Sequence, residues 1–354
     1  MNALDERMMR RCLELALRGS GAVSPNPMVG AVLALGERVL GEGWHRAYGG
    51  PHAEVRCFDA VSDADRPLIP QTTLYCNLEP CSHHGKTPPC ADLILRMGVR
   101  RVVVGCADPN PEVAGKGIAR LRASGVAVTE GVLAREARDL NSAFFHWIAH
   151  RRPYVILKWA ESADGFIART GERTPISHSL ALRLTHRWRA EADAILVGAR
   201  TALLDDPSLT TRFFPGKNPL RLSLDPRAAL PRAARLLDDT APTWIYGPQR
   251  EGDWRQTRFI PLETGRLEWH RLLDDLAQAG KAILLVEGGA DVHRQWLASG
   301  LWNEIRVLSS DRPLGEGTPS AQLPHFVCLQ ALKRVSPTDT YLRYTKPIEG
   351  ADRL

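Results

Sequence analysis

Residues 78–90 read LEPCSHHGKTPPC, and residues 51–55, upstream of them, read PHAEV. The two segments together hold two cysteines, three histidines and two glutamates. Zinc prefers imidazole and thiolate ligands, and a catalytic zinc site uses three protein ligands and leaves a fourth position for water. The segments therefore predict a zinc site with the candidate ligands His52, Cys81, His83, His84 and Cys90.

The third ligand beside His52 and Cys81 is either His84 or Cys90. Zinc-dependent nucleobase deaminases carry H-x-E followed by P-C-x-x-C, and His84 stands where that pattern has its second cysteine. Imidazole suits zinc, so His84 keeps the spacing with an acceptable ligand. Cys90 follows Pro88-Pro89 at the start of a predicted helix, where the helix dipole lowers the pKa of a thiol. We favour Cys90 and keep His84 as the alternative.

Glu54 lies two residues after His52, a spacing that does not place two side chains on one face inside a helix. We therefore expect the pair at a helix entrance, directly after Pro51. A carboxylate beside a zinc-bound water can take its proton and pass it to the substrate. A structural zinc would normally have four ligands and no adjacent acid, so the pattern favours a catalytic site with Glu54 as proton carrier.

The zinc segment follows an apolar run over residues 72–78 that reads as a buried strand, and helices and strands alternate on both sides of it. Such alternation predicts a three-layer α/β domain. The pattern restarts after HRRP at residues 150–153, and a chain of 354 residues is expected to form two domains. We predict an α/β domain over residues 1–149, a second over 150–354, and one long helix over 134–150.

Composition argues against several classes of protein. No apolar run reaches eighteen residues, so no membrane-spanning helix is predicted. The cysteines number seven and six of them precede residue 107, which is typical of a reduced, cytoplasmic protein with a metal site. The net charge of +6 is spread along the second half of the chain, so it does not predict a nucleic-acid partner. This positive charge would equally favour binding of a small ligand that bears phosphate.

Longer motifs resemble a known family. SPNPMVGAV (24–32), GEGWH (41–45), PHAEV, LEPCSHHGKTPPC and DPNPEVAGKG (108–117) are similar to the deaminase half of the bifunctional riboflavin-biosynthesis deaminase/reductase family. LKWAESADGFIA (157–168), ILVGARTALLDDPSLTTR (195–212) and VEGGADVH (286–293) resemble its reductase half. The resemblance implies a cytidine-deaminase-like three-layer α/β/α domain followed by a dihydrofolate-reductase-like α/β domain.

The same resemblance implies two reactions. The first is hydrolytic deamination of 2,5-diamino-6-(5-phosphoribosylamino)pyrimidin-4-one at a zinc site. The second is NADPH-dependent reduction of the ribosyl chain of 5-amino-6-(5-phosphoribosylamino)uracil to ribityl. The implied partners are therefore small phosphoribosyl pyrimidines, with neither nucleic acid nor membrane, and the chain is expected to form a homo-oligomer, either a dimer or a tetramer.

Individual roles are also implied by the resemblance. In the deaminase half, zinc is implied at His52, Cys81 and Cys90, proton transfer at Glu54, and substrate contacts at Asn26, His45 and Lys86. In the reductase half, cofactor contacts are implied at Ala160, Ile176, Thr201, Asp205, Glu287, Gly288, Gly289, Ala290, Asp291, Val292 and His293. Substrate contacts are implied there at Lys158, Arg173, Arg189, Leu209, Arg212 and Glu287.

Physical arguments support part of the reductase set. The chain lacks G-x-G-x-x-G after the first strand of either domain, but two glycines join a predicted strand ending at Glu287 to a helix opening near Asp291. Backbone N–H groups at such a turn bind anions. Guanidinium groups bind phosphate bidentately, so Arg189 and Arg212 are expected to clamp the substrate phosphate. Lys158 and Asp205 are expected near the ribose.

Two segments depart from the family pattern. GERTPIS (171–177) has Arg173 in place of a small hydroxyl residue and Pro175 in place of tryptophan. LSSDRPLGEG (308–317) stands where the family has an apolar segment. Both departures fall in the reductase half, so the alternative is a deaminase whose C-terminal domain is inactive or acts on another substrate.

Overall fold

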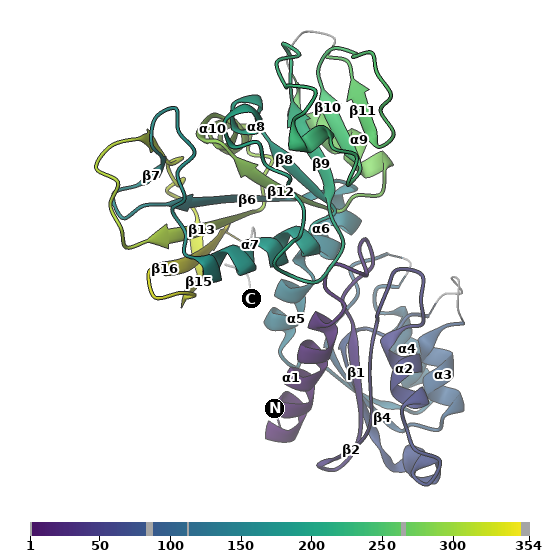
Figure 1. Ribbon diagram of the computed structural model, residues 1–354. Helices are drawn as coiled ribbons and strands as arrows, with labels where there is room; N and C mark the ends of the chain where they lie inside the picture. The colour runs from purple at the N-terminus through teal and green to yellow at the C-terminus, as the bar shows by residue number, and fades with distance from the viewer. Residues whose placement is uncertain (1, 83–87, 112, 263–266, 348–354) are drawn as a thin grey trace. The chain divides into compact units, whose positions relative to one another are not determined.

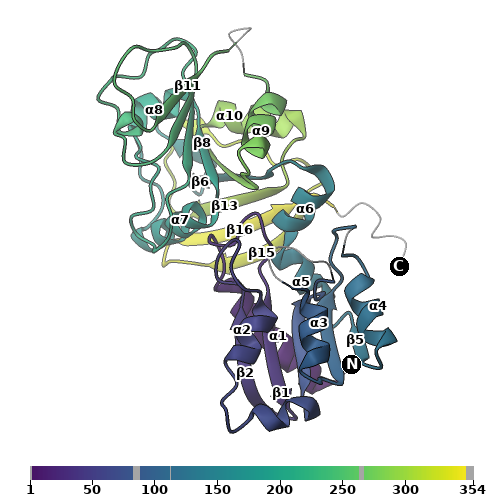
Figure 2. The same cartoon turned by 90° about the vertical axis from the view of Figure 1, so that its right-hand side faces the viewer.

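The computed structural model describes residues 2–82, 88–111, 113–262 and 267–347 (Figures 1 and 2). The chain divides into two compact units, Met1–Arg151 and Arg152–Leu354, each with its own sheet. No helix in these described ranges is both long and apolar enough to cross a membrane.

The N-terminal unit is built on a five-stranded sheet in the order β2-β1-β3-β4-β5 (Figure 1). β1 pairs antiparallel with β2 and β3, whereas β3, β4 and β5 run parallel. The strands are β1 (Gly30–Leu35), β2 (Arg38–Trp44), β3 (Thr73–Leu78), β4 (Arg101–Cys106) and β5 (Ala127–Glu130).

Helices cover both faces of this sheet because its central strands are apolar on both sides. In β3, Leu74 and Cys76 enter one core cluster while Tyr75 enters another on the opposite face. One face packs against α1 and α5, and the other against α2, α3 and α4. The helical elements are α1 (Ala3–Leu17), α2 (Ala53–Asp59), η1 (Arg66–Gln71), α3 (Cys90–Arg96), α4 (Lys116–Ala123), α5 (Ala134–Leu140) and α6 (Ser142–His150).

The single helix predicted over residues 134–150 is wrong, because Asn141 separates α5 from α6. The side chain of Asn141 bonds to a distant loop. Its Oδ1 accepts from the backbone N–H of Met28 at 2.8 Å, and its Nδ2 donates to the Met28 carbonyl at 2.9 Å. An asparagine whose amide is engaged with another segment favours a break over helix continuation. The two hydrogen bonds to Met28 also fix the loop that carries Asn26.

The C-terminal unit holds a nine-stranded sheet in the order β11-β10-β9-β8-β12-β6-β13-β16-β15 (Figure 2). Its first seven strands run parallel, and β16 pairs antiparallel with β13 and β15. The strands are β6 (Tyr154–Glu161), β8 (Ala194–Val197), β9 (Leu220–Leu224), β10 (Thr243–Tyr246), β11 (Thr257–Ile260), β12 (Ile283–Gly288), β13 (Glu304–Ser310), β15 (Cys328–Arg334) and β16 (Asp339–Thr345). β7 (Phe166–Ala168) and β14 (Thr318–Pro319) form a separate pair.

α9 and α10 bury Leu272, Leu276 and Trp296 against one face of this sheet. α7 contacts β12 and α8 contacts β9. The helical elements are α7 (Ser179–Glu191), α8 (Ala199–Asp205), η2 (Arg235–Leu237), α9 (Trp269–Gln278) and α10 (Ala290–Ser299). In parallel sheets ligands bind beyond the carboxyl ends of the strands, so the ends of β6, β8 and β12 are where a site is expected.

Candidate active sites

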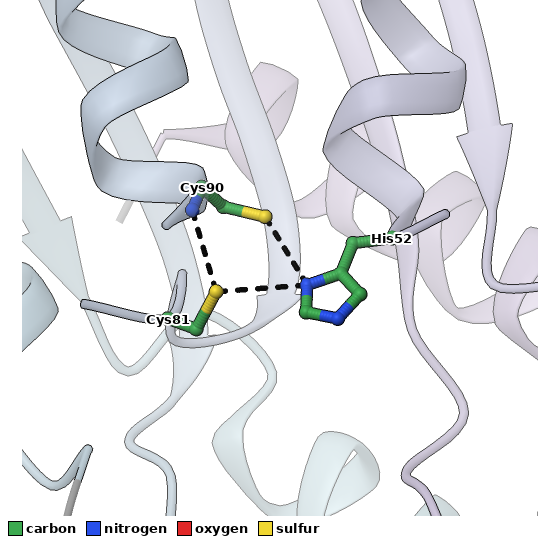
Figure 3. A group of neighbouring side chains, drawn as sticks. All are labelled: His52, Cys81 and Cys90. Carbon is green, nitrogen blue, oxygen red and sulfur yellow. Dashed lines mark hydrogen bonds between the residues drawn. The ribbon is translucent and has the colours of Figure 1, made fainter. Parts of the chain in front are cut away.

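His52, Cys81 and Cys90 come together in the N-terminal unit (Figure 3). Their ligand atoms all lie within 4.8 Å of one another: His52 Nδ1 is 3.2 Å from Cys90 Sγ and 3.6 Å from Cys81 Sγ. His52 caps α2, Cys81 follows the end of β3, and Cys90 is the first residue of α3. Three neighbouring segments thus bring one imidazole and two thiols to a single point.

The local backbone explains how His52 reaches that point. Gly43 in β2 faces the first turn of α2, and a Cβ on Gly43 would lie 2.3 Å from the Ala53 carbonyl oxygen. Only glycine permits this approach. Cys81 also receives a bond from the backbone N–H of Cys90 at 3.3 Å, so the start of α3 points a donor at sulfur. The Cys90 thiol, and then His52 and this backbone bond, hold the pKa of Cys81 well below its ordinary value, although burial opposes them.

Glu54 lies in the first turn of α2, two residues after the cap His52, as the spacing requires. Its side chain is buried, and burial raises the pKa of its carboxyl group. Electrostatic interactions place it beside His52, Cys81 and Cys90. A buried carboxyl group with a raised pKa, next to three candidate metal-ligating side chains, is suited to hold and release a proton.

Asn26 and His45 lie beside this cluster. Asn26 Nδ2 is 3.2 Å from His45 Nε2, and His45 Nδ1 is 3.1 Å from the Pro51 carbonyl oxygen. The ring of His45 meets the ring of His52 edge-on, with centroids 5.8 Å apart. The predicted substrate residue Lys86, and His83 and His84 with it, lie outside the described residues.

Sequence reasoning missed Glu79, which is buried between β3 and Cys81. Its carboxylate accepts hydrogen bonds from four backbone N–H groups. The donors are Asp108 at 3.2 Å, Gly115 at 3.0 Å, Gly117 at 2.9 Å and Ile118 at 3.2 Å. Gly117 must be glycine here, because a Cβ would lie 2.0 Å from the Pro80 carbonyl oxygen. Glu79 thus fixes the DPNP loop next to the zinc segment. The glutamate directly before Pro80-Cys81 was the available signal.

In the C-terminal unit, β12 ends in the Gly288-Gly289 turn and α10 begins at Ala290. A Cβ on Gly288 would lie 2.6 Å from His293 Cε1, and one on Gly289 would lie 3.0 Å from Thr201 Oγ1. His293 is buried; its Nε2 is 3.2 Å from the Val286 carbonyl oxygen, and its Nδ1 has no partner among the described residues. Burial lowers the pKa of His293 to about 4, so the ring is neutral.

Glu287 stands at the end of β12 in contact with Arg189 of α7. Arg189 Nε donates to Oε1 at 2.9 Å and Nη2 to Oε2 at 2.7 Å, and both side chains are about nine-tenths buried. Lys158 of β6 lies near both, and burial lowers the pKa of its ammonium group. Burial opposes ionisation of Glu287, but Arg189 and Lys158 outweigh it and hold its pKa at about 2. In this structure the Arg189 guanidinium is therefore engaged by the Glu287 carboxylate.

Arg212 differs from Arg189. Its Nη1 donates to Thr210 Oγ1 at 3.0 Å, and within the described ranges no carboxylate pairs with it. Partial burial and then the guanidinium groups of Arg189, Arg235 and Arg173 hold its pKa below the ordinary value. Arg173 also interacts electrostatically with Asp205, the last residue of α8. The positive charges of these arginines lie close together and would favour the binding of an anion.

The other predicted reductase residues lie in or beside β6, α7, α8 and α10. Ala160 is in β6, Thr201 is in α8, and Ile176 precedes α7. Leu209 is buried with a φ of 52°, in the loop after α8. Asp291 and Val292 are in the first turn of α10. Residues 308–317, which depart from the family pattern, are anchored by Asp164. Its carboxylate accepts hydrogen bonds from the backbone N–H groups of Leu314 at 3.0 Å and Gly315 at 2.7 Å.

Residues 2–106 match the model of the cytidine and deoxycytidylate deaminase zinc-binding region, and residues 153–340 match the RibD C-terminal domain. The riboflavin biosynthesis protein RibD of Aquifex aeolicus is 38% identical over 320 residues, covering 89% of this chain and 89% of that protein. RibD of Escherichia coli is 35% identical over 329 residues, covering 88% and 89%. The chain belongs to the RibD family.

Solved structures agree with RibD membership. A diaminohydroxyphosphoribosylaminopyrimidine deaminase/5-amino-6-(5-phosphoribosylamino)uracil reductase from Thermotoga maritima superposes with a TM-score of 0.87 at 32% identity, covering 97% of this chain and 99% of that chain. Acinetobacter baumannii RibD gives a TM-score of 0.82 at 32% identity, covering 98% and 99%. The predicted RibD architecture is confirmed: a cytidine-deaminase-like zinc-binding region precedes a RibD C-terminal domain, each on its own α/β sheet.

Proposed function

We propose that this RibD protein carries out both reactions of its relatives: zinc-dependent deamination of the diaminopyrimidine, then NADPH-dependent reduction of the ribosyl chain of the resulting uracil. The observation that carries the proposal is that each unit assembles its own site: His52, Cys81, Cys90 and Glu54 in one, and Lys158, Glu287 and the Gly288-Gly289 turn in the other. A deaminase-only protein is not favoured, because both halves match their families.

The donor set of the first site fits a catalytic zinc ion. One imidazole and two thiols are three ligands of the kind zinc prefers, and that number leaves a position open for water. A zinc ion held there would make water a nucleophile at neutral pH. Glu54 is proposed to carry out proton transfer: its buried carboxyl group can hold a proton and deliver it to a ring nitrogen or to the departing amino group. Asn26 and His45 are proposed to orient the pyrimidine.

The second site fits a nicotinamide cofactor bearing phosphates. Gly288 in the Gly288-Gly289 turn has a positive φ and lies too close to His293 for a Cβ to fit without a shift. The first N–H groups of α10 have no partner within the helix and are available to an anion. The buried Nδ1 of His293, which has no hydrogen-bond partner among the described residues, lies beside that turn. NADPH bound there would supply the hydride. Lys158 and Asp205 are proposed to orient the ribose, and Arg212 to hold the substrate phosphate.

The test assays the two half-reactions separately, together with zinc content. We expect about one zinc per chain, deamination of the diaminopyrimidine without NADPH, and oxidation of NADPH when the deaminated intermediate is supplied. Glu54→Gln should keep zinc and the reductase reaction and lose deamination. Well-folded protein that leaves NADPH unoxidised in the presence of the intermediate would refute the second activity, and metal-free protein that still deaminates would refute the first.

We further propose a cytoplasmic homo-oligomer that acts only on small molecules. The seven free thiols fit a reducing compartment, and the buried thiols of Cys12, Cys57 and Cys76 pack within the two cores of the N-terminal unit. Sedimentation of the purified protein measures its oligomeric state directly.

A further inference from the structure

His186 and Arg189 lie one helical turn apart on α7 and belong to a closed chain of contacts. Arg189 holds Glu287 at two points and donates from Nη1 to the Thr210 carbonyl oxygen at 3.3 Å. Arg212 Nη1 donates to Thr210 Oγ1 at 3.0 Å, and the backbone N–H of Arg212 donates to His186 Nδ1 at 2.9 Å. This closed chain of contacts connects the end of β12, α7 and the loop that carries Arg212.

His186 can accept the hydrogen bond from Arg212 only while its imidazole is neutral. The side chain is buried, at 3% exposure, and faces the guanidinium groups of Arg189 and Arg212, the Lys158 ammonium group and the Glu287 carboxylate. Burial, and then the arginines, lower its pKa to about 4. Because Nδ1 accepts the Arg212 N–H, the ring proton of the neutral form sits on Nε2. A protonated ring would turn this acceptor into a donor.

Two further contacts fix the same stretch of loop. Thr211 donates its backbone N–H to Asn218 Oδ1 at 2.9 Å, and the Phe213 ring meets the His186 ring edge-on with centroids 4.7 Å apart. The Arg212 backbone is thus held from both sides. Its guanidinium donates to the Thr210 hydroxyl and lies over the Phe213 ring, and no carboxylate among the described residues pairs with it. Arg212 is the open cation of the site, and Arg189 is the engaged one.

We propose that His186 is a positioning residue of the reductase site, which holds the Arg212 backbone so that this guanidinium receives the substrate phosphate. The inference rests on the proposed reductase function and deepens it. It assigns the phosphate to Arg212, whose guanidinium has no carboxylate partner among the described residues, whereas the guanidinium of Arg189 is paired with Glu287. His186 acts through Arg212 and need not touch the substrate.

The test uses the full-length protein with ribose 5-phosphate as the phosphate-bearing probe, measured by calorimetry, and NADPH binding measured by fluorescence. Loss of one uncharged hydrogen bond should weaken ribose 5-phosphate binding by roughly two- to tenfold in His186→Leu. His186→Asn places an acceptor near the position of Nδ1 and should restore most of that loss. His270→Gln, on an exposed histidine of α9, is the matched control.

Further readouts separate positioning from folding. We expect NADPH affinity, deaminase rate and unfolding temperature of His186→Leu to stay near wild type, and KM for the uracil substrate to rise more than kcat falls. Because His186 acts through Arg212, adding His186→Leu to Arg212→Ala should cost nothing beyond Arg212→Ala alone. Multiplying losses in the double variant, or no rescue by His186→Asn, would overturn the inference. A wild-type protein inert toward both NADPH and ribose 5-phosphate would overturn the proposed reductase function and this inference with it, whereas an insensitive His186→Leu in an active enzyme overturns the inference alone.

Discussion

Arg189 and Glu287 form a bidentate ion pair, with N···O distances of 2.9 and 2.7 Å, in which both side chains are about nine-tenths buried. The pair joins the last turn of the reductase unit's first long helix, α7, to the end of its central strand β12. A buried charge without its partner is strongly destabilising, even where replacing both partners is nearly neutral. Glu287 is therefore a structural residue as well as a proposed site residue.

Glu287→Gln should destabilise the C-terminal unit by about 3–5 kcal/mol, because it leaves the Arg189 guanidinium buried and unpaired. Urea unfolding followed by tryptophan fluorescence measures this, since Trp44 and Trp147 are the only tryptophans before residue 152. The matched control is Arg187→Gln, which removes a half-buried i,i+4 partner of Glu191 on the same helix and should cost about 0.5 kcal/mol or less. Equal losses in the two variants would contradict the prediction.

The same pair makes stability depend on pH. The pKa of Glu287 is lowered to about 2, against about 4.3 for an unfolded glutamate. A lowered pKa contributes stability that is present above about pH 4.3 and is lost as pH falls toward 2. The difference in unfolding free energy between wild type and Glu287→Gln should therefore be constant from about pH 5 to 7 and shrink below about pH 4. A difference that grows on acidification would show that the pair is not ionised in the native protein.

Cys90→Ser should lose zinc and deamination together, because a serine hydroxyl is a poor replacement for a thiolate ligand. Elemental analysis after dialysis against a weak chelator measures the zinc. His84→Ala is the informative comparison, since His84 is the alternative third ligand in the sequence pattern, and it should keep its zinc. Zinc retained by Cys90→Ser and lost from His84→Ala would reverse the ligand assignment. Reduction should proceed normally in both variants.

Glu79→Gln should raise the deaminase KM by about tenfold or more while zinc and the reductase reaction are kept. The carboxylate accepts four backbone N–H groups, whereas an amide offers one oxygen and turns an NH₂ group toward the remaining donors. The DPNP loop would then lose its fixed position. Glu130→Gln, on the exposed edge strand β5, is the control. A normal KM in Glu79→Gln would show that the loop does not line the pyrimidine site.

Arg173→Ser replaces the residue that departs from the family pattern with the small hydroxyl side chain expected there. Arg173 is exposed and interacts with both Asp205 and Arg212, so its loss should weaken ribose 5-phosphate binding by about two- to fivefold. Because exposed charges are screened by salt, the wild-type protein should lose more affinity than Arg173→Ser between low and high ionic strength. Parallel salt dependences would place Arg173 outside the phosphate site.

Much of the fold could be predicted because it follows from local patterning. Alternating apolar strands and amphipathic helices indicated two α/β domains, and β3 and α3 lie within a residue or two of the segments read from the sequence. The helix over 134–150 was wrong because Asn141 bonds to Met28, more than a hundred residues away. Sequence patterning also did not predict the hairpin β15–β16, whose strands are only partly buried and so lack clear alternation.

The residue types and their spacing alone predict a zinc site, and the expectation that His52 and Glu54 lie at a helix entrance follows from local geometry. The surroundings of the two arginines, in contrast, depend on how the chain packs. Arg189 and Arg212 look alike in sequence, yet one is buried against Glu287 and the other is held by His186 and Thr210 without a carboxylate among the described residues. The reason is physical: a charge takes its role from the groups packed around it, and those groups come from distant parts of the chain.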